Sequence, residues 1–380
     1  CISSAASDVY KRQAQPRLRE AAAVLRLPPA LLVRRLVLPA ALPAFMAGVR
    51  LALATGWTSL LAVELLASSE GIGYLMVWAR QLFMLDIVFV CILVIGLLGV
   101  CMDRGIGWLD RRLVHWPHPA TAELRRGPRY QGWQRLQPWL LPLALLALWQ
   151  VASDQQWVDP NILPSPLAVL ATTGNGLLDG SLLGGMGLSL GRTLGGLLLG
   201  GGLGFAFGLL LGLSRFSERL LGPTLAAIRQ IAIFAWVPLL TAWFGLGELA
   251  KWVFVALAAF FPLFIATQRS VAQLSPQLAE AAQVLRLNLW QRLRRLVLPG
   301  AAPGIFAGLR ISLIYAWLGT IGAEYFMPSN GGIGSQMISA QQLLRMDLIM
   351  AGMLLVGLTG ALLNLIGQQL ELRATRWRHA

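Results

Sequence analysis

The chain has 380 residues, of which 56% are hydrophobic and only 13% are charged, and its mean hydropathy is +0.65. Soluble domains usually carry about 25% charged residues, so this composition excludes an ordinary soluble protein and also a disordered one. Apolar runs close to the roughly 20 residues that cross a bilayer recur along the chain, which predicts several membrane spans. The net charge of +14 would suit a nucleic-acid-binding protein, but no basic face carries interleaved aromatics, so no nucleic-acid partner is expected.

The chain opens on residues 1–13 (CISSAASDVYKRQ), which begin with Cys1 and are too polar for a signal peptide. We interpret the N-terminus as truncated or partly foreign, and the internal repeat described below favours truncation. Beyond it the apolar segments predict an all-α integral membrane protein with about eight spans. The expected spans are 42–66, 86–108, 138–152, 188–213, 224–246, 252–270, 301–323 and 347–370.

The basic residues predict how the chain is oriented. They gather in 11–35, 104–135, 286–295 and 373–378, whereas 152–187 has none. Because Lys and Arg concentrate in cytoplasmic loops, these four segments are expected inside, with the C-terminus in the cytoplasm. His115 and His118 have a metal-like spacing, but Pro117 lies between them and no other ligand is nearby. No nucleophile has a base nearby either, so neither a metal site nor a catalytic site is expected.

The strongest feature is an internal repeat. Residues 20–39 (EAAAVLRLPPALLVRRLVLP) and 280–299 (EAAQVLRLNLWQRLRRLVLP) share EAA, VLRL and RRLVLP at an offset of 260. At this offset Arg50 matches Arg310, Trp57 matches Trp317 and Glu64 matches Glu324. After one inserted residue, Gly71-Ile72-Gly73 matches Gly332-Ile333-Gly334 and Asp86 matches Asp347.

Repeats of this length indicate duplicated units. We therefore expect 14–117 to be the last two spans of a first unit and 118–136 to be a basic cytoplasmic linker. Residues 137–380 would form a complete six-span second unit. By comparison with that unit, about 130 further residues would precede residue 14 in a complete protein.

The repeated segment is predicted to be a short amphipathic cytoplasmic helix. Leu285, Leu289, Leu293 and Leu296 recur at helical spacing, and Pro299 is expected to end the helix before the next span. Such a helix can lie on the membrane or dock into a groove of a partner, and the pattern alone does not choose between them.

The same segment resembles the signature loop of bacterial ABC importer permeases, in which Glu-Ala-Ala is followed at fixed spacing by Ile-x-Leu-Pro. Both copies keep the spacing, with Leu in place of Ile, but Arg26 and Arg286 replace the usual turn glycine. Shorter motifs resemble the nitrate/sulfonate/taurine branch of these permeases. They are Leu163-Pro164-Ser165-Pro166, Ser189-Leu190-Gly191-Arg192, Trp243-Phe244-Gly245-Leu246-Gly247 with Lys251, and Ala323-Glu324 before Gly332-Ile333-Gly334.

The resemblance implies a type I importer transmembrane domain in the bacterial inner membrane. A cytoplasmic ABC ATPase dimer and an extracytoplasmic solute-binding protein would be its partners, and small anions such as nitrate, sulfonates or taurine its solutes. This chain has no G-x-x-x-x-G-K-[ST] loop, so ATP and Mg are expected in the partner and no cofactor here. The resemblance implies ATPase coupling by Glu20, Ala21, Ala22, Arg26, Pro39, Glu280, Ala281, Ala282, Arg286 and Pro299.

Ionisable residues in spans are candidates for function. The candidates for the translocation path are Arg192, Trp317, Glu324, Trp57 and Glu64. For Arg192, which is expected to open a span on the outer side, pairing with a neighbouring helix or a lipid headgroup is favoured over attraction of an anionic solute. The two tryptophans are expected to pack rather than to gate.

Two other classes of function are alternatives to the importer. A secondary transporter or channel without an ATPase would place ionisable residues at the bilayer midplane in broken helices. In this sequence the charges are expected near the span ends, and the repeated feature is a cytoplasmic helix, which favours the importer. A membrane-embedded enzyme would need a ligand cluster or a catalytic pair, which the sequence lacks.

Overall fold

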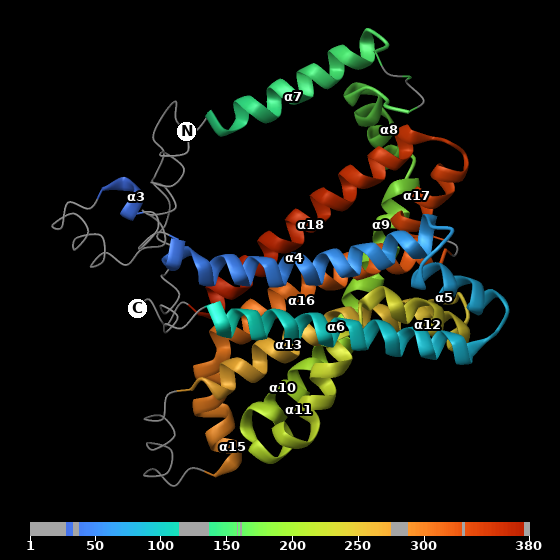
Figure 1. Ribbon diagram of the computed structural model, residues 1–380. Coiled ribbons are helices and arrows are strands. Elements are labelled where there is room, and N and C mark those ends of the chain that lie inside the picture. Colours follow the sequence, from blue (N-terminus) through green and yellow to red (C-terminus); the bar gives the residue numbers. More distant parts are fainter. Residues whose placement is uncertain are drawn as a thin grey trace.

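Two bundles of long helices make up the fold (Figure 1). The computed structural model describes residues 28–32, 38–113, 137–157, 159, 162–274, 288–328 and 331–375. Within these ranges the chain is helical and contains no strand, which confirms the all-α prediction.

Helices α4 (Leu38–Ala67), α5 (Ile72–Gln81) and α6 (Leu85–Leu113) form a first bundle, preceded by the short α3 (Pro29–Leu32). The larger second bundle holds the remaining helices. They are α7 (Gln137–Asp154), α8 (Pro166–Leu178), α9 (Ser181–Gly196), η3 (Leu197–Gly201), α10 (Gly202–Leu213), α11 (Arg215–Gln230), η4 (Ile233–Ala235), α12 (Trp236–Phe244), α13 (Glu248–Ala272), α15 (Leu289–Arg292), η5 (Leu293–Val297), α16 (Leu298–Phe326), α17 (Ile333–Gln342) and α18 (Met346–Ala374).

The described residues contain six helices long and apolar enough to cross a membrane, or seven if a bent pair is counted, so the expected eight spans are not confirmed. The apolar stretch of α7, Leu140–Asp154, is shorter than a span. The segment expected as a straight span at 224–246 is instead α11 and α12, which meet at 86°. The bend has a local cause, because α11 is amphipathic and buries no residue, whereas α12 is apolar and largely buried.

Pro299 does not end a helix, so that prediction was wrong. It lies in the first turn of α16 and follows directly on the π-helical turn η5 and on α15. The π-helical turn directly before it can accommodate the missing N–H, so the helix continues through the proline. Pro39 likewise lies in the first turn of α4.

The sequence repeat is also a structural repeat, since α4, α5 and α6 correspond to α16, α17 and α18. Gly71 and Gly332 both have a positive φ, at +108° and +101°. Arg50 Nε donates to Asp103 Oδ1 over 2.7 Å, and Arg310 Nε donates to Asn364 Oδ1 over 2.8 Å. The duplicated sequence has therefore kept both its helix pattern and a polar contact between the first and third helices.

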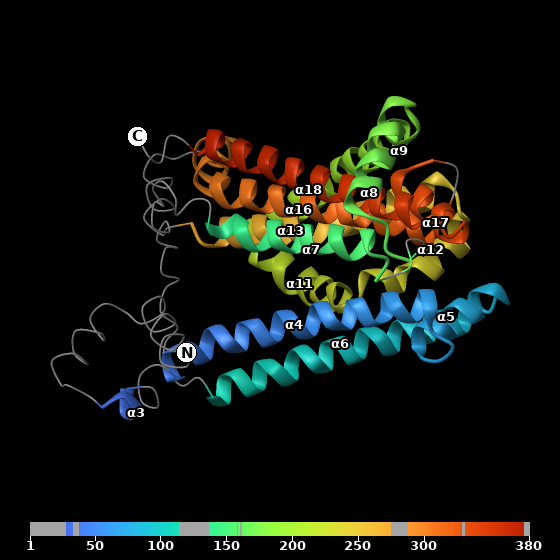
Figure 2. The same ribbon diagram turned by 90° about the horizontal axis from the view of Figure 1, so that it is seen from above.

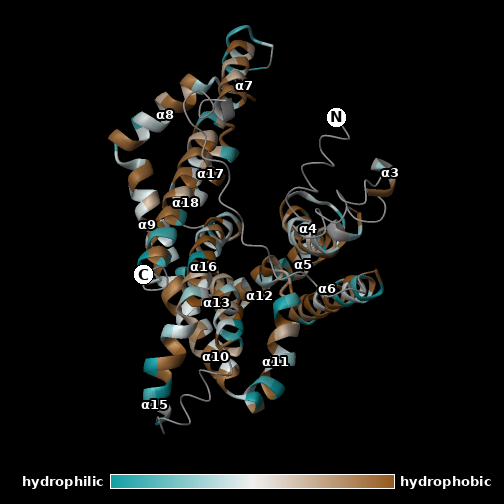
Figure 3. Ribbon diagram, turned by 90° about the vertical axis from the view of Figure 1, so that its left-hand side faces the viewer, coloured by the Kyte–Doolittle hydropathy of each residue, from teal (hydrophilic) through white to brown (hydrophobic). Residues whose placement is uncertain are grey.

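In both bundles the first long helix starts, and the last one ends, at the same end of the molecule (Figure 1). Helices α5, α12 and α17 gather at the opposite end. This arrangement agrees with the alternating path predicted from the basic segments. Helices α4, α6 and α18 expose large hydrophobic side chains such as Leu51, Leu93 and Leu362. Helices α11 and α15 carry hydrophilic turns (Figure 3).

The two bundles meet through α11, η4 and α12 of the second (Figure 2). Leu61, Met76 and Ile95 of the first bundle form one buried cluster with Ala235 and Leu239 of the second. Arg80 Nη1 of α5 adds a longer polar contact to Thr241 Oγ1 at 3.4 Å. Apolar packing therefore provides most of the contact between the bundles.

Close helix packing in the second bundle depends on small residues of the η3–α10 region against α13. At Gly200 an added Cβ would overlap the backbone carbonyl of Ala256, whereas at Gly202 it would meet nothing within 4 Å. Glycine lets two helix backbones approach closely. In lipid, where no hydrophobic effect drives helices together, such close packing stabilises their association.

We expect Gly200→Val to destabilise the protein by about 1–3 kcal/mol more than Gly202→Val, because only the first places a side chain into α13. Both changes replace glycine by the same residue two positions apart, so propensity effects are closely matched. Unfolding in detergent, followed by circular dichroism, measures the difference. Equal losses of stability would contradict the packing role of Gly200.

Candidate functional site

Arg192 of α9 is the centre of a buried group of charges. Its side chain is 5% exposed. Its Nη1 donates to Glu324 Oε1 of α16 over 2.7 Å and to the carbonyl oxygen of Gly331 over 3.1 Å. On the other side of the guanidinium, Nη2 and Nε donate to the two carboxylate oxygens of Glu248 over 2.6 and 2.7 Å. One arginine thus joins α9, α13, α16 and the segment before α17.

Glu324 is fully buried, and each of its carboxylate oxygens has more than one donor. Ser189 Oγ lies 2.7 and 2.9 Å from the two oxygens, and the backbone N–H of Gly334 donates to Oε2 over 2.9 Å. Ser189 Oγ also accepts from the N–H of Ile333 over 3.0 Å. The first turn of α17 is therefore fixed to α9 and α16 by polar contacts.

Lys251 completes the group, which we call the charge cluster (Ser189, Arg192, Glu248, Lys251 and Glu324). Its side chain is fully buried, and Nζ lies 3.6 Å from Glu248 Oε1. Two cations and two carboxylates make the cluster neutral. Glu248 connects the charge cluster to the surface, because its side chain is 53% exposed. Because a lone buried charge is costly, each member depends on its partners.

The start of α9 is set by a local turn outside the span. Asp179 Oδ1 accepts from the hydroxyl of Ser181 over 2.7 Å and from its backbone N–H over 2.9 Å. Both hydrogen bonds lower the pKa of Asp179, and the bond from the Ser181 hydroxyl has the larger effect. The carboxylate is therefore kept ionised, and any stability it adds is lost only as the pH falls through this lowered pKa.

Gly332 has to be glycine on two grounds. Its φ is +101°, in a region that side-chain-bearing residues avoid, and an added Cβ would run into Arg192 Nη1 and the Glu324 carboxylate. The Gly-Ile-Gly sequence of the repeat therefore forms the turn that closes over the buried ion pair.

The structure brings two of the predicted path residues, Arg192 and Glu324, into contact, and it corrects one position. Arg192 was expected to open its span, but α9 begins at Ser181, so Arg192 lies about three turns inside it. The glycines at the start of α9 concealed the true helix start. Its guanidinium is paired with two carboxylates, in line with the favoured pairing over direct attraction of a solute. Trp317 is 2% exposed and its Nε1 donates to the Val356 carbonyl over 3.1 Å, as expected of a packing residue.

Sequence reasoning missed Glu248 as a partner of Arg192 and placed Lys251 only within a motif. The available signal was their spacing, since an acid and a base at i and i+3 at the start of an apolar helix lie on one face. What could not be read from the sequence is that this face meets Arg192, 56 residues away along the chain.

The first bundle holds the counterpart of this site in a reduced form. Glu64 Oε2 accepts from the N–H of Gly73 over 2.8 Å, which repeats the bond between Glu324 and Gly334. Among the described residues no arginine or serine meets Glu64. Trp57 Nε1 is buried without a hydrogen-bond partner among those residues, unlike that of Trp317.

Most of the predicted coupling residues lie outside the described residues. They are Glu20, Ala21, Ala22, Arg26, Glu280, Ala281, Ala282 and Arg286. Pro39 and Pro299 are described, each in the first turn of a long helix. Within the described ranges no group of three or more His, Cys, Asp or Glu could hold a metal ion.

Comparison with known proteins decides the family. Residues 11–115 and 181–372 both match the binding-protein-dependent transport system inner membrane component family. The chain belongs to this family. Within it the chain is an ABC importer permease of the sulfonate/taurine/nitrate branch. Each matched segment contains one copy of the sequence repeat, and the second segment begins well before its copy, at residue 181.

Three relatives illustrate the branch. The permease protein SsuC of Bacillus subtilis (strain 168), named for aliphatic sulfonates transport, is 35% identical over 264 residues, which cover 70% of this chain and 95% of SsuC. The taurine transport system permease protein TauC of Escherichia coli (strain K12) is 31% identical over 238 residues, 61% of this chain and 86% of TauC. The bicarbonate transport system permease protein CmpB of Synechococcus elongatus is 32% identical over 264 residues, 64% of this chain and 94% of CmpB.

We expect Glu324→Ala to lower the free energy of unfolding of the permease by about 3–5 kcal/mol, since it leaves Arg192 with a missing partner in a buried site. The matched control is Glu64→Ala in the first copy, where the carboxylate is half-buried and has one backbone donor, and where about 1.5 kcal/mol is expected. Denaturant unfolding in detergent measures both. Similar losses at the two positions would contradict the structural importance of the charge cluster.

Proposed function

We propose that this permease forms the membrane path of an ATP-driven importer for small oxyanions, with sulfonates as the leading class. The observation that carries the proposal is the family match over both copies, together with relatives named for aliphatic sulfonates, taurine and bicarbonate transport. The solutes for which these three relatives are named all contain an oxyanion group, and the net charge of +14 suits anions near the membrane surface.

In this proposal, partner chains supply the free energy for transport and deliver the solute. A cytoplasmic ABC ATPase dimer would hold ATP and Mg, and an extracytoplasmic binding protein would deliver the solute. Residues 20–35 and 280–295 would be the coupling helices, with Glu20 and Glu280 against the ATPase. Their place before α4 and α16 supports this role. A displacement of either segment by the ATPase would be transmitted directly to a long helix that ends near Glu64 or Glu324.

Within this proposal the charge cluster keeps α9, α13, α16 and α17 together at the end predicted to be extracytoplasmic. The charges of the cluster fully compensate one another. The cluster is therefore better suited to hold the helices rigidly together than to bind a solute. The repeat supports a tandem arrangement in which 14–117 belongs to a first unit and 137–380 to a second. The inner-membrane location with a cytoplasmic C-terminus belongs to the same proposal.

The test is co-purification of the tagged full chain with a co-expressed ABC ATPase. We expect Glu20→Lys combined with Glu280→Lys to reduce the retained ATPase at least tenfold, because the reversal replaces acids at both proposed contacts. Glu70→Lys, an exposed acid at the opposite end, is the matched control and should retain the ATPase. Failure of any ATPase to bind the unaltered chain, or release by the control alone, would contradict the proposal.

A further inference from the structure

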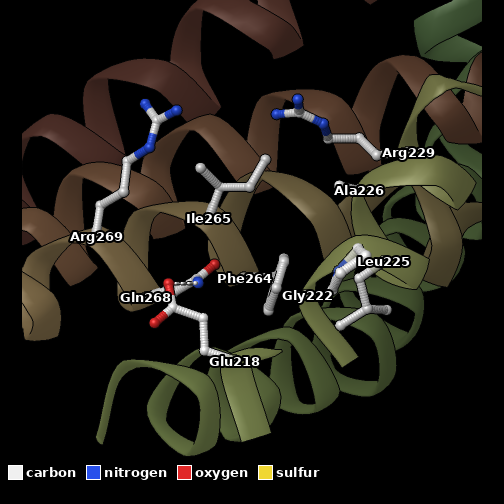
Figure 4. A pocket seen from close by; sticks show the side chains of 10 residues that line it. Glu218, Gly222, Leu225, Ala226, Arg229, Phe264, Ile265, Gln268 and Arg269 are labelled. Atoms are coloured by element: carbon white, nitrogen blue, oxygen red, sulfur yellow. Dashed lines mark hydrogen bonds between the residues drawn. The ribbon is translucent and has the colours of Figure 1, made fainter. Parts of the chain in front are cut away.

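A cavity of about 360 Å³ lies between α11 and α13 in the second bundle (Figure 4). Its volume is in the range of sites that take small molecules. Helix α11 contributes Glu218, Leu225 and Arg229 to its wall, and α13 contributes Phe264 and Arg269. According to the orientation predicted from the basic segments, this end of α13 faces the cytoplasm.

The two arginines approach the cavity from different helices and lie on the same side of it, on either side of Ile265 (Figure 4). No ion pair or hydrogen bond holds either guanidinium within the described part of the chain. Arg50 and Asp103 of the first bundle are close enough to interact electrostatically with Arg229, but they are already paired with each other at 2.6 Å. Two positive charges at this cavity are thus left without a bonded carboxylate.

The other residues that line the cavity determine which chemical group can bind beside an anion. Leu225, Ala226, Phe264 and Ile265 supply an apolar surface beside the arginines. The one acid, Glu218, lies on the opposite side, where its Oε1 accepts from Gln268 Nε2 over 3.4 Å (Figure 4). This hydrogen bond keeps the carboxylate away from the two guanidinium groups.

We propose that the cavity is a binding site for an oxyanion that carries a short apolar group, with Arg229 and Arg269 holding the oxyanion. Guanidinium groups bind such oxygens through paired charge-assisted hydrogen bonds, and the apolar wall takes the substituent. The ligand has two possible sources, a transported alkyl sulfonate or the headgroup of an anionic lipid. The first source rests on the proposed function, whereas the second does not.

The location strengthens the assignment. Helix α11 is one of the two helices through which the second bundle contacts α6 of the first, so the cavity lies beside the contact between the two copies. Any movement of α11 with respect to α13 would change the position of Arg229 with respect to Arg269. The site would then hold an anion in one arrangement of these two helices and release it in another.

The first measurement uses 1-pentanesulfonate as the probe and the full chain in nanodiscs of neutral phosphatidylcholine. We expect saturable binding, and a loss of affinity of about tenfold or more in Arg229→Gln combined with Arg269→Gln. Arg219→Gln removes the same charge from α11 outside the cavity and should change the affinity less than twofold. Each single variant is measured as well, with gel filtration to confirm folding.

The second measurement identifies the source. The chain is placed in nanodiscs containing phosphatidylglycerol, and retained lipid is counted by native mass spectrometry. Lipid that is lost in the double variant and displaced by 1-pentanesulfonate supports the site with lipid as its ligand. Binding of 1-pentanesulfonate in neutral lipid, with no retained phosphatidylglycerol, supports the sulfonate. If neither probe distinguishes the double variant from Arg219→Gln, the site is refuted.

The two proposals fail separately. Loss of the ATPase contact would overturn the importer while leaving the arginine-dependent binding intact. Conversely, ATP-driven uptake of the sulfonate that is unchanged in the double variant would remove the cavity from the path and leave the importer standing.

Discussion

The contact between Arg192 and Glu324 is the constraint around which the second bundle is organised. A guanidinium and a carboxylate buried in an apolar protein are each expensive to leave alone, so four helical elements have to meet where these two side chains meet. Glu248 and Lys251 bring the charge to zero, and Ser189 with the Gly334 N–H completes the bonding of Glu324. The apolar packing of α13 against α16 then surrounds a polar centre whose geometry is fixed.

The duplication shows which parts of this arrangement are common to both copies. The glutamate, the glycine turn and the arginine of the first long helix recur, with Glu64–Gly73 and Glu324–Gly334 making the same bond. The arginine partner of the third helix has diverged, since Asp103 in one copy corresponds to Asn364 in the other. In the second copy Arg310 Nη1 lies 3.5 Å from Glu371 Oε2 of the same helix, so the arginine is still ion-paired but with a carboxylate at another position.

Much of the fold could be predicted from the sequence, because apolar length and repeated segments are local signals. Each of the six long described helices overlaps an expected span, and the pairing of the two copies follows from four of these spans, 42–66, 86–108, 301–323 and 347–370. The bend between α11 and α12 could not be predicted by apolar content, since an amphipathic helix next to an apolar one looks like one long segment. Of the charge cluster, Arg192 and Glu324 were recognised as candidates, but the contact of Arg192 with Glu248 depends on tertiary packing that no spacing rule supplies. Pro299 misled for a related reason, because a proline that follows a π-helical turn within a continuous helix has the same letter as one that stops a helix.

The π-helical turn η3, between α9 and α10, has a geometrical consequence for this long segment. A turn of this kind holds one residue more than an α-turn, and one residue corresponds to a rotation of about 100° around the axis. The side chains on either side of Leu197–Gly201 are therefore out of phase with a single uninterrupted helix. Gly196 before the turn, Gly200 within it, and Gly204 and Gly208 beyond it all meet α13, at intervals of four residues. The extra residue of the turn thus keeps one glycine face on α13 along the whole segment, whereas a helical wheel with a uniform step would spread these four glycines over about 120°.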